Sequence, residues 1–295
     1  MKTISVLTYD NNPKTLQVLS EIQKWSVSHD ELEILVPKRL STWMEFTNVT
    51  FVNDVKLKDC NVLISIGGDG TFLSAARLVA RIETPILGVH TGSTGFLTDF
   101  SPTSFQGALD SIIQGDFELK SRLMLDVGLI EDNSAIAKDY IINELQIKPL
   151  EHTSMIELEV KINGYVLTKY WADSLLISTP TGSTAYNLAA GGPIIYPTAE
   201  AVILNPVNPP SLTVRPIVVP ADATILIKNT QGTAFKVILD GREERIIQAN
   251  QSLKIRRSKF NTQIIRSPEY GFIEALKHKL GWSGDRFVAP GDNNA

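Results

Sequence analysis

The sequence predicts two architectures in one chain: a doubly wound, Rossmann-like α/β domain and then a β-rich, β-sandwich-like second domain. Over the first hundred residues, short apolar runs alternate with segments of helical periodicity. After residue 114, hairpin signals such as Asn163-Gly164 separate short strands instead. A length of 295 residues also favours two domains over one, at roughly 150 residues per domain.

The elements of the first domain follow from apolar patterning. Residues 62–66 form an apolar run interrupted only by Ser65, which is typical of a parallel strand covered on both faces. Residues 71–79 combine good helix formers with apolar side chains three and four positions apart. By the same criteria we expect strands at 3–8, 32–36 and 85–89 and helices at 13–27 and 103–114. We assign residues 1–100 to this α/β domain.

The second domain, residues 101–268, is predicted from β-rich runs and turn residues. Asn163-Gly164 favours a type I′ turn, and Asp240-Gly241 marks another turn. A strand-like run covers residues 139–147, and further strands are expected at 155–162, 166–171, 217–219, 224–227, 235–239 and 252–256. Residues 272–280 read as a helix within a C-terminal segment, 269–295.

Composition restricts the class of protein. Hydrophobic residues make up 43% and charged residues 20% of the chain, as in ordinary globular proteins. A formal charge of −4 argues against wide nucleic-acid or anionic-membrane surfaces. The N-terminus turns polar too early for a signal peptide, and no apolar run approaches the roughly 20 residues of a membrane span, so we expect a cytoplasmic protein.

Disulfide and zinc sites are not expected. Cys60 is the only cysteine, so no internal disulfide can form. His29, His90, His152 and His278 show no paired ligand spacing.

The segment around Asp69 is the strongest functional signal. An apolar strand ends in Gly67-Gly-Asp-Gly-Thr71, which is followed by the predicted helix. Ligands of open α/β sheets bind at the carboxyl ends of strands, and helix N-termini there attract anions. A carboxylate among phosphate-binding donors is unfavourable through charge repulsion unless it accepts a proton or binds a metal. Asp69 is therefore predicted to act as a base or as a metal ligand, which the sequence alone does not separate.

A second segment, residues 173–186, repeats the strand-to-loop pattern. Thr179, Thr181, Ser183 and Thr184 supply hydroxyl groups, and Gly182 permits a sharp bend. Such a loop can hold a nucleotide. Taken alone, the segment favours an ordinary Ser/Thr-rich turn with a capping serine over a nucleotide-binding loop.

Together, the two segments resemble the NAD kinase family, whose hallmarks are the Gly-Gly-Asp-Gly-Thr turn and the loop Thr179-Pro-Thr-Gly-Ser-Thr-Ala-Tyr186. The resemblance extends through residues 88–98, Asn143-Glu144, Arg215-Pro216 and Leu280-Gly-Trp282, so it covers most of the chain. Diacylglycerol and sphingosine kinases share the first turn, and phosphofructokinases carry a similar one. The second loop is particular to NAD kinases.

The resemblance implies transfer of the γ-phosphoryl of ATP, accompanied by Mg²⁺, to the 2′-hydroxyl of the adenosine ribose of NAD. Asp69 would then be the catalytic residue, with Gly67, Gly68, Gly70 and Thr71 on the phosphates. The NAD-binding residues implied are Phe96, Asn143, Glu144, Asp173, Thr184, Ala185 and Tyr186. The family also implies a C-terminal helix that returns to the first domain, an active site in the interdomain crevice, and a homodimer or homotetramer.

The sequence departs from the family pattern at His90-Thr91, at Thr94 and at Ser174, which bears on substrate and phosphate-donor preference. Three alternatives remain open at this point: a lipid kinase with the same first turn, a noncatalytic NAD(P)-binding sensor, and a sugar kinase of the phosphofructokinase type. Arginines that could face phosphates are Arg122, Arg215, Arg242 and Arg245, and their spacing does not choose among them.

Overall fold

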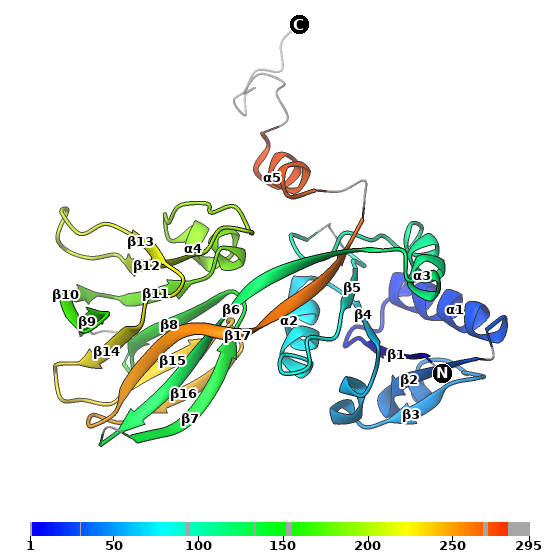
Figure 1. Cartoon of the computed structure of the whole chain (residues 1–295), viewed down its shortest axis with the longest axis horizontal. Helices are drawn as coiled ribbons and strands as arrows, with labels where there is room; N and C mark the ends of the chain where they lie inside the picture. The colour runs from blue at the N-terminus through cyan, green and yellow to red at the C-terminus, as the bar shows by residue number, and fades with distance from the viewer. Residues whose placement is uncertain are drawn as a thin grey trace, which may run out of the picture.

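The computed structural model describes residues 2–29, 31–92, 95–132, 134–151, 155–267 and 271–282. The positions of Thr94, His152 and the tail from residue 283 lie outside the described residues. An 11-stranded sheet and a 6-stranded sheet make up the β-structure, and Figure 1 shows the α/β half to one side of the β-rich half.

The first half is doubly wound, as predicted. Its parallel strands lie in the order β5-β4-β1-β2-β3. Their bounds are β1 (Lys2–Leu7), β2 (Leu32–Pro37), β3 (Thr50–Val52), β4 (Val62–Ile66) and β5 (Ile86–Val89). The helices are α1 (Pro13–Val27), α2 (Asp69–Leu78) and α3 (Phe105–Gln114), with short 3₁₀ turns η1 (Lys38–Thr42) and η2 (Asp54–Lys58).

Burial explains the two layers of helices. Val62, Ile64 and Ile66 share one core with apolar side chains of α1 and α3, whereas Leu63 belongs to a core with Phe72 of α2. Alternate residues of a strand point to opposite faces, so β4, which is buried along its whole length, supplies both cores. The helix assignments follow the sequence closely: α1 has the predicted bounds, and the Asn12 side chain caps it by accepting from Thr15 N–H at 2.9 Å.

The second half is a sandwich of antiparallel strands. The 6-stranded sheet has the order β13-β12-β11-β8-β15-β16, and one apolar core joins it to β6, β9, β14 and β17 of the larger sheet. The strands are β6 (Glu118–Glu131), β7 (Ser134–Ile141), β8 (Glu144–Pro149), β9 (Ile156–Ile162), β10 (Tyr165–Ala172), β11 (Ser174–Ser178), β12 (Ala201–Val207), β13 (Ile217–Pro220), β14 (Ile225–Asn229), β15 (Phe235–Leu239), β16 (Glu243–Ile247) and β17 (Ser252–Arg266).

Strand β17 connects the two halves, and the sequence prediction of 252–256 covered only its start. Ile255 pairs with Ile225 of β14 in the sandwich, whereas Ile264 pairs with Ile86 of the parallel sheet. Figure 1 shows β6 and β17 passing together from one half to the other. The domain boundaries at residues 100 and 268 stay a prediction.

Two further details position the site. The predicted single run at residues 139–147 is wrong: β7 ends at Ile141 and β8 begins at Glu144, because Ile142 and Asn143 turn the chain from one sheet to the other. Asn163-Gly164 and Asp240-Gly241 both have positive φ at each residue, as type I′ turns require.

A C-terminal helix, α5 (Phe272–Leu280), has the predicted bounds. The Phe272 ring lies 6.1 Å from the Phe96 ring and 5.2 Å from the Tyr196 ring, so α5 contacts both halves. None of the helices among the described residues is long and apolar enough to cross a membrane.

Candidate active site

The glycine turn, residues 67–71, follows β4 directly. Gly67 has φ +150°, and a Cβ there would stand 2.4 Å from Thr71 Oγ1, so a side chain is excluded. Gly68 is the N-cap of α2, and nothing lies within 4 Å of a Cβ built on it. The helix begins at Asp69, two residues before the predicted start, which places Asp69 in its first turn beside unpaired backbone N–H groups.

The loop 95–98 holds the Asp69 carboxylate from outside the helix. Phe96 N–H donates to Oδ2 at 2.9 Å and Leu97 N–H donates to Oδ1 at 3.1 Å. The Thr98 hydroxyl donates to Oδ1 at 3.3 Å. A Cβ on Gly95 would lie 1.8 Å from Oδ1, so glycine is required for this approach. Asp69 is half-buried and oriented, and its carboxylate keeps lone pairs for a further donor.

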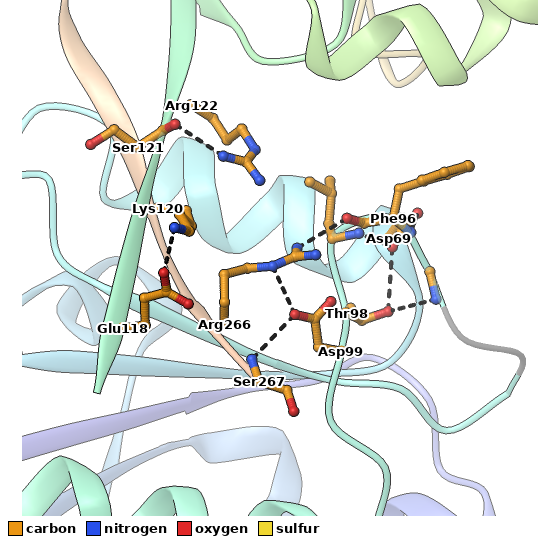
Figure 2. A network of polar contacts seen from close by, with 12 residues as sticks. Asp69, Phe96, Thr98, Asp99, Glu118, Lys120, Ser121, Arg122, Arg266 and Ser267 are labelled. Carbon is orange, nitrogen blue, oxygen red and sulfur yellow. Dashed lines mark hydrogen bonds and ion pairs between the residues drawn. The ribbon is translucent and has the colours of Figure 1, made fainter. Parts of the chain in front are cut away.

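A buried ion pair supports that loop in turn. Arg266 Nε lies 2.7 Å from Asp99 Oδ2, and Arg266 Nη1 donates to the Phe96 carbonyl at 3.2 Å (Figure 2). Burial raises the pKa of Asp99 to about 6 despite the opposing charge of Arg266. The sequence did not single out Thr98, Asp99 or Arg266 for this role.

The Asn143-Glu144 segment is held by Asp240. Its carboxylate accepts from the N–H groups of Ile142 at 3.1 Å, Asn143 at 2.8 Å and Glu144 at 3.2 Å. Burial raises the pKa of Asp240 to about 6, against these hydrogen bonds. Sequence reasoning had found only a turn at Asp240-Gly241. Asn143 itself is half-buried.

Glu144 is a buried acid that favours its protonated form. The residue is 6% exposed, and burial, followed by the nearby charge of Asp240, raises its pKa to about 8. A hydrogen bond from Tyr186 N–H opposes this shift. Glu144 Oε2 is buried and has no hydrogen-bond partner among the described residues. A ligand hydroxyl or ring nitrogen would satisfy it.

The hydroxyl loop, residues 179–186, contains the 3₁₀ turn η3 (Thr181–Thr184) and the start of α4 (Tyr186–Ala189). Its hydroxyls mostly fix the loop itself. Thr179 Oγ1 accepts from Gly182 N–H at 3.0 Å, Ser183 donates to Pro180 O at 2.6 Å, and Thr184 donates to Thr181 O at 3.2 Å.

The hydroxyl loop packs tightly against the Asn143-Glu144 segment. A Cβ on Gly182 would stand 2.2 Å from Asn143 O. The structure therefore brings the Asn143-Glu144 segment against the hydroxyl loop, which is far from it in the sequence, and Glu144 accepts from Tyr186 N–H.

Asp173 and Tyr186 line a common cavity of about 240 Å³ on the outer side of this cluster. Asp173 Oδ2 accepts from Asn208 Nδ2 at 3.0 Å, and Ser174, one of the departures from the family pattern, lines the same space. Tyr186 is 42% exposed, so its ring is available to a ligand.

The turn between β15 and β16 links the two ligand-facing regions. Asp240 holds Asn143, and two residues later Arg242 hydrogen-bonds the Ser74 hydroxyl on α2. A Cβ on Gly70 would stand 2.4 Å from Arg242 Nη2, so the guanidinium lies directly over the glycine turn. A cavity of about 490 Å³ adjoins it, lined by Tyr9, Ser74, Arg77, Tyr140 and Arg242 among others.

The remaining candidates lie elsewhere or act differently. The Phe96 ring packs against Phe272, and the Lys279 ammonium lies 4.9 Å from the centre of the Phe96 ring. The backbone N–H of Phe96 holds Asp69. Arg245 pairs with Asp139, and Arg215 is exposed, with its Nη1 donating to Val214 O at 3.1 Å. Burial lowers the pKa of His90, whose Nδ1 contacts Gly92 O at 3.2 Å.

The carboxylates near the glycine turn fit a metal ion that is brought by a bound phosphate ligand rather than held by the protein alone. Across the described ranges, no three His, Cys, Asp or Glu side chains gather into a metal site. Asp69 is the one carboxylate at the glycine turn, and Mg²⁺-like ions are commonly held by one or two carboxylates plus substrate phosphates.

Comparison with known families covers both halves of the chain. Residues 5–117 match the ATP-NAD kinase N-terminal domain, and residues 142–267 match the ATP-NAD kinase C-terminal domain. The glycine turn and the hydroxyl loop fall in different matched regions, so the family match does not rest on the turn that lipid kinases share.

Curated relatives match over nearly the full length. An NAD kinase of Geotalea daltonii is 34% identical over 97% of this chain and 100% of its own length. An NAD kinase of Shewanella oneidensis is 34% identical over 97% and 98%, respectively.

Solved structures share the fold. A yeast NADH kinase complexed with NADH superposes with a TM-score of 0.89 at 22% identity, covering 98% of this chain and 90% of that one. An NAD kinase from Archaeoglobus fulgidus in complex with ATP gives a TM-score of 0.72 at 22% identity, covering 95% and 98%.

Proposed function

The chain belongs to the NAD kinase family, and on that premise we propose that it transfers the γ-phosphoryl group of ATP to the 2′-hydroxyl of the adenosine ribose of NAD, giving NADP and ADP. One observation carries the assignment of the site. The β15–β16 turn joins the Asn143-Glu144 segment, through Asp240, to the glycine turn, through Arg242. A nucleotide held at the first would therefore present its ribose near the Asp69 carboxylate.

Asp69 is proposed to remove the proton of the attacking hydroxyl. A ribose hydroxyl has a pKa far above neutral and attacks phosphorus poorly unless its proton has an acceptor. As the bond from O2′ to the γ-phosphorus forms, the bond from that phosphorus to the β–γ bridging oxygen breaks and ADP leaves. The hydrogen bonds from Phe96, Leu97 and Thr98 fix the carboxylate for this step.

The phosphates of ATP are proposed to lie against Gly67, Gly68, Gly70 and Thr71. The support is the open space over Gly68 and the N-terminus of α2, whose backbone N–H groups favour an anion. A divalent metal accompanies ATP in this chemistry, and we assign it as Mg²⁺, with Asp69 as the residue placed to reach it. The ion would neutralise charge on the phosphates.

NAD is proposed to bind through Asn143, Glu144, Asp173, Thr184, Ala185 and Tyr186. Glu144 with its raised pKa is a hydrogen-bond donor at neutral pH, which suits an acceptor on a ribose or base. The exposed Tyr186 ring offers a surface for stacking. Phe96 is proposed to contribute through its backbone N–H to Asp69, with its ring beside α5.

The proposal extends to a cytoplasmic homodimer or homotetramer. Tyr165, Val166 and Trp171 of β10 expose 81%, 58% and 55% of their surface, which suits a contact between subunits. Light scattering of the purified protein measures the mass directly, and a monomer at micromolar concentration contradicts this part.

The decisive experiment supplies NAD, ATP and Mg²⁺ and quantifies NADP with an NADP-specific dehydrogenase. Wild type should form NADP, and Asp69→Asn should lose about 10²- to 10⁴-fold in rate, the usual contribution of a general base. Circular dichroism establishes that the variant is folded. Tight NAD binding without NADP formation by wild type would identify a sensor instead.

A further inference from the structure

A third polar cavity lies beside the loop 95–98, away from the glycine turn. It encloses about 190 Å³ between β6, β17 and the start of α5, and its lining includes Lys120, Arg122, Arg266, Tyr196 and Phe272. In the view of Figure 2, Arg266 lies between Arg122 and Asp69. The kinase mechanism above uses neither Lys120 nor Arg122.

The basic side chains of this cavity are incompletely neutralised. Arg266 is paired with Asp99, and Lys120 is paired with Glu118. Arg122 is only 6% exposed, and its Nη1 donates to the carbonyl of Ser121 at 3.1 Å. Within the described part of the chain, no carboxylate lies within 4.0 Å of the Arg122 guanidinium. Three cations thus face two carboxylates.

Such an arrangement is unfavourable without an anion. A buried charge that lacks a counterion carries a large desolvation cost. Consistent with this, burial lowers the pKa of Arg122 to about 10, and the charge of Arg266 adds to the effect, while the charges of Asp99 and Tyr196 offset it only in part. A bound anion would remove the imbalance.

The geometry of the donors and the size of the cavity define the class of anion. Guanidinium groups present planar, forked donors that match phosphate oxygens. Pockets for drug-sized ligands enclose about 300–1,000 Å³. A space of about 190 Å³ is smaller and suits a phosphate or pyrophosphate group rather than a whole nucleotide. The rings of Tyr196 and Phe272, 5.2 Å apart, bound its outer side.

We propose that this cavity, built by Arg122, Arg266 and Lys120, is a binding site for a phosphate group, separate from the glycine turn. A phosphate group bound there would also contact Arg266, which supports the loop that holds the Asp69 carboxylate. Arg266 Nη1 donates to the Phe96 carbonyl, and Phe96 N–H donates to Asp69. An anion that draws on Arg266 therefore acts on the loop that orients Asp69.

The test titrates inorganic phosphate, and separately pyrophosphate, into the protein by calorimetry and by phosphorus NMR, without NAD or ATP. The titration is therefore independent of the kinase assignment. Wild type should bind saturably, Arg122→Gln should bind at least about 10-fold more weakly, and Lys120→Gln should bind several-fold more weakly, because each removes charge-assisted hydrogen bonds. Arg215→Gln, an arginine outside the cavity, is the matched control and should bind as wild type.

Thermal unfolding separates binding from folding. Without phosphate, Arg122→Gln should melt no lower than wild type, since it removes an unpaired buried charge. With phosphate, wild type should gain stability and Arg122→Gln should not. If Arg122→Gln does not fold, phosphate binding is measured in Arg122→Lys and in Lys120→Gln instead. Wild-type affinity for phosphate in both variants would reject the site. The proposal is also rejected if phosphate fails to saturate, or if Gly68→Ala abolishes binding while Arg122→Gln leaves it intact.

Discussion

The glycine turn and the hydroxyl loop face the same proposed ligands, but they are held in opposite ways. The glycine turn depends on the absence of side chains at Gly67 and Gly95, which leaves room for Thr71 and for the Asp69 carboxylate. The neighbouring loop 95–98 then fixes Asp69 by hydrogen bonds. The hydroxyl loop is held by its own Thr and Ser hydroxyls and by the buried acid Glu144, which accepts from Tyr186 N–H. Asp240 in turn holds the backbone of the Asn143-Glu144 segment. Small steric changes should therefore damage the first region most, and changes of charge the second.

Among the residues that support Asp69 and the hydroxyl loop, the largest expected effect is at Gly95. In Gly95→Ala the new methyl group would stand 1.8 Å from Asp69 Oδ1, so the carboxylate or the loop must move. A displacement of about 1 Å at a reacting group costs on the order of 100-fold in rate, and we expect that loss in kcat. Steady-state kinetics measures it. Gly107→Ala on α3, where a Cβ meets nothing within 4 Å, is the control and should keep wild-type activity.

Gly68→Ala tests whether the open space over the glycine turn is for phosphate. Its backbone angles, φ −90° and ψ −175°, are accessible to alanine, and no protein atom lies within 4 Å of the new methyl. The fold should therefore be unchanged. The KM for ATP should rise about 10-fold, equivalent to about 1.4 kcal/mol, because the methyl keeps phosphate from the backbone. An unchanged KM for ATP would place the phosphates elsewhere.

Asp240→Asn probes the second region through its charge. The amide keeps the size of the side chain but loses one acceptor oxygen for the N–H groups of Ile142, Asn143 and Glu144. Losing a buried hydrogen bond costs about 1 kcal/mol, so we expect the KM for NAD to rise about 5-fold while the KM for ATP stays near wild type. The NAD-specific change distinguishes positioning of Asn143-Glu144 from general loss of stability. Equal increases in both constants would contradict that role.

The contrast also explains what the sequence could predict. Elements set by local patterning, such as α1, β4, β15 and α5, have the predicted bounds. The second half of β17 was missed because its residues form a strand only by pairing with β5 and β6, far away in the sequence.

The site follows the same division. Asp69 was predicted from its own turn, and the structure places Asn143, Glu144 and Tyr186 together. For Asp240 the sequence predicted only an Asp-Gly turn. Its contact with the Asn143-Glu144 segment depends on β15 lying beside β8, which the local sequence does not reveal. The Ser and Thr residues at 179–184 correctly predicted a loop. In the fold, most of their hydroxyls hydrogen-bond the backbone of the loop itself.

The smallest expected effect is the pH dependence that Glu144 gives to the second region. Its pKa is raised from 4.5 to about 8 in the folded protein by burial and by Asp240, so the native state keeps a proton that the unfolded state releases. The contribution to stability is thus complete below pH 4.5 and is lost as pH rises through about 8. Asp99 and Asp240 have pKa values of about 6, so most of their contribution to stability is already lost at lower pH than that of Glu144.

Urea unfolding between pH 6.5 and 8 isolates this effect. The free energy of unfolding of wild type should fall by up to about 1.4 kcal/mol per pH unit, the limit for one proton. In Glu144→Gln, which has no proton to lose, that slope should be absent, whereas Asp69→Asn, a change in the first region, should keep it. A wild-type slope in Glu144→Gln would mean that another group titrates there and that the hydroxyl loop does not rest on a protonated acid.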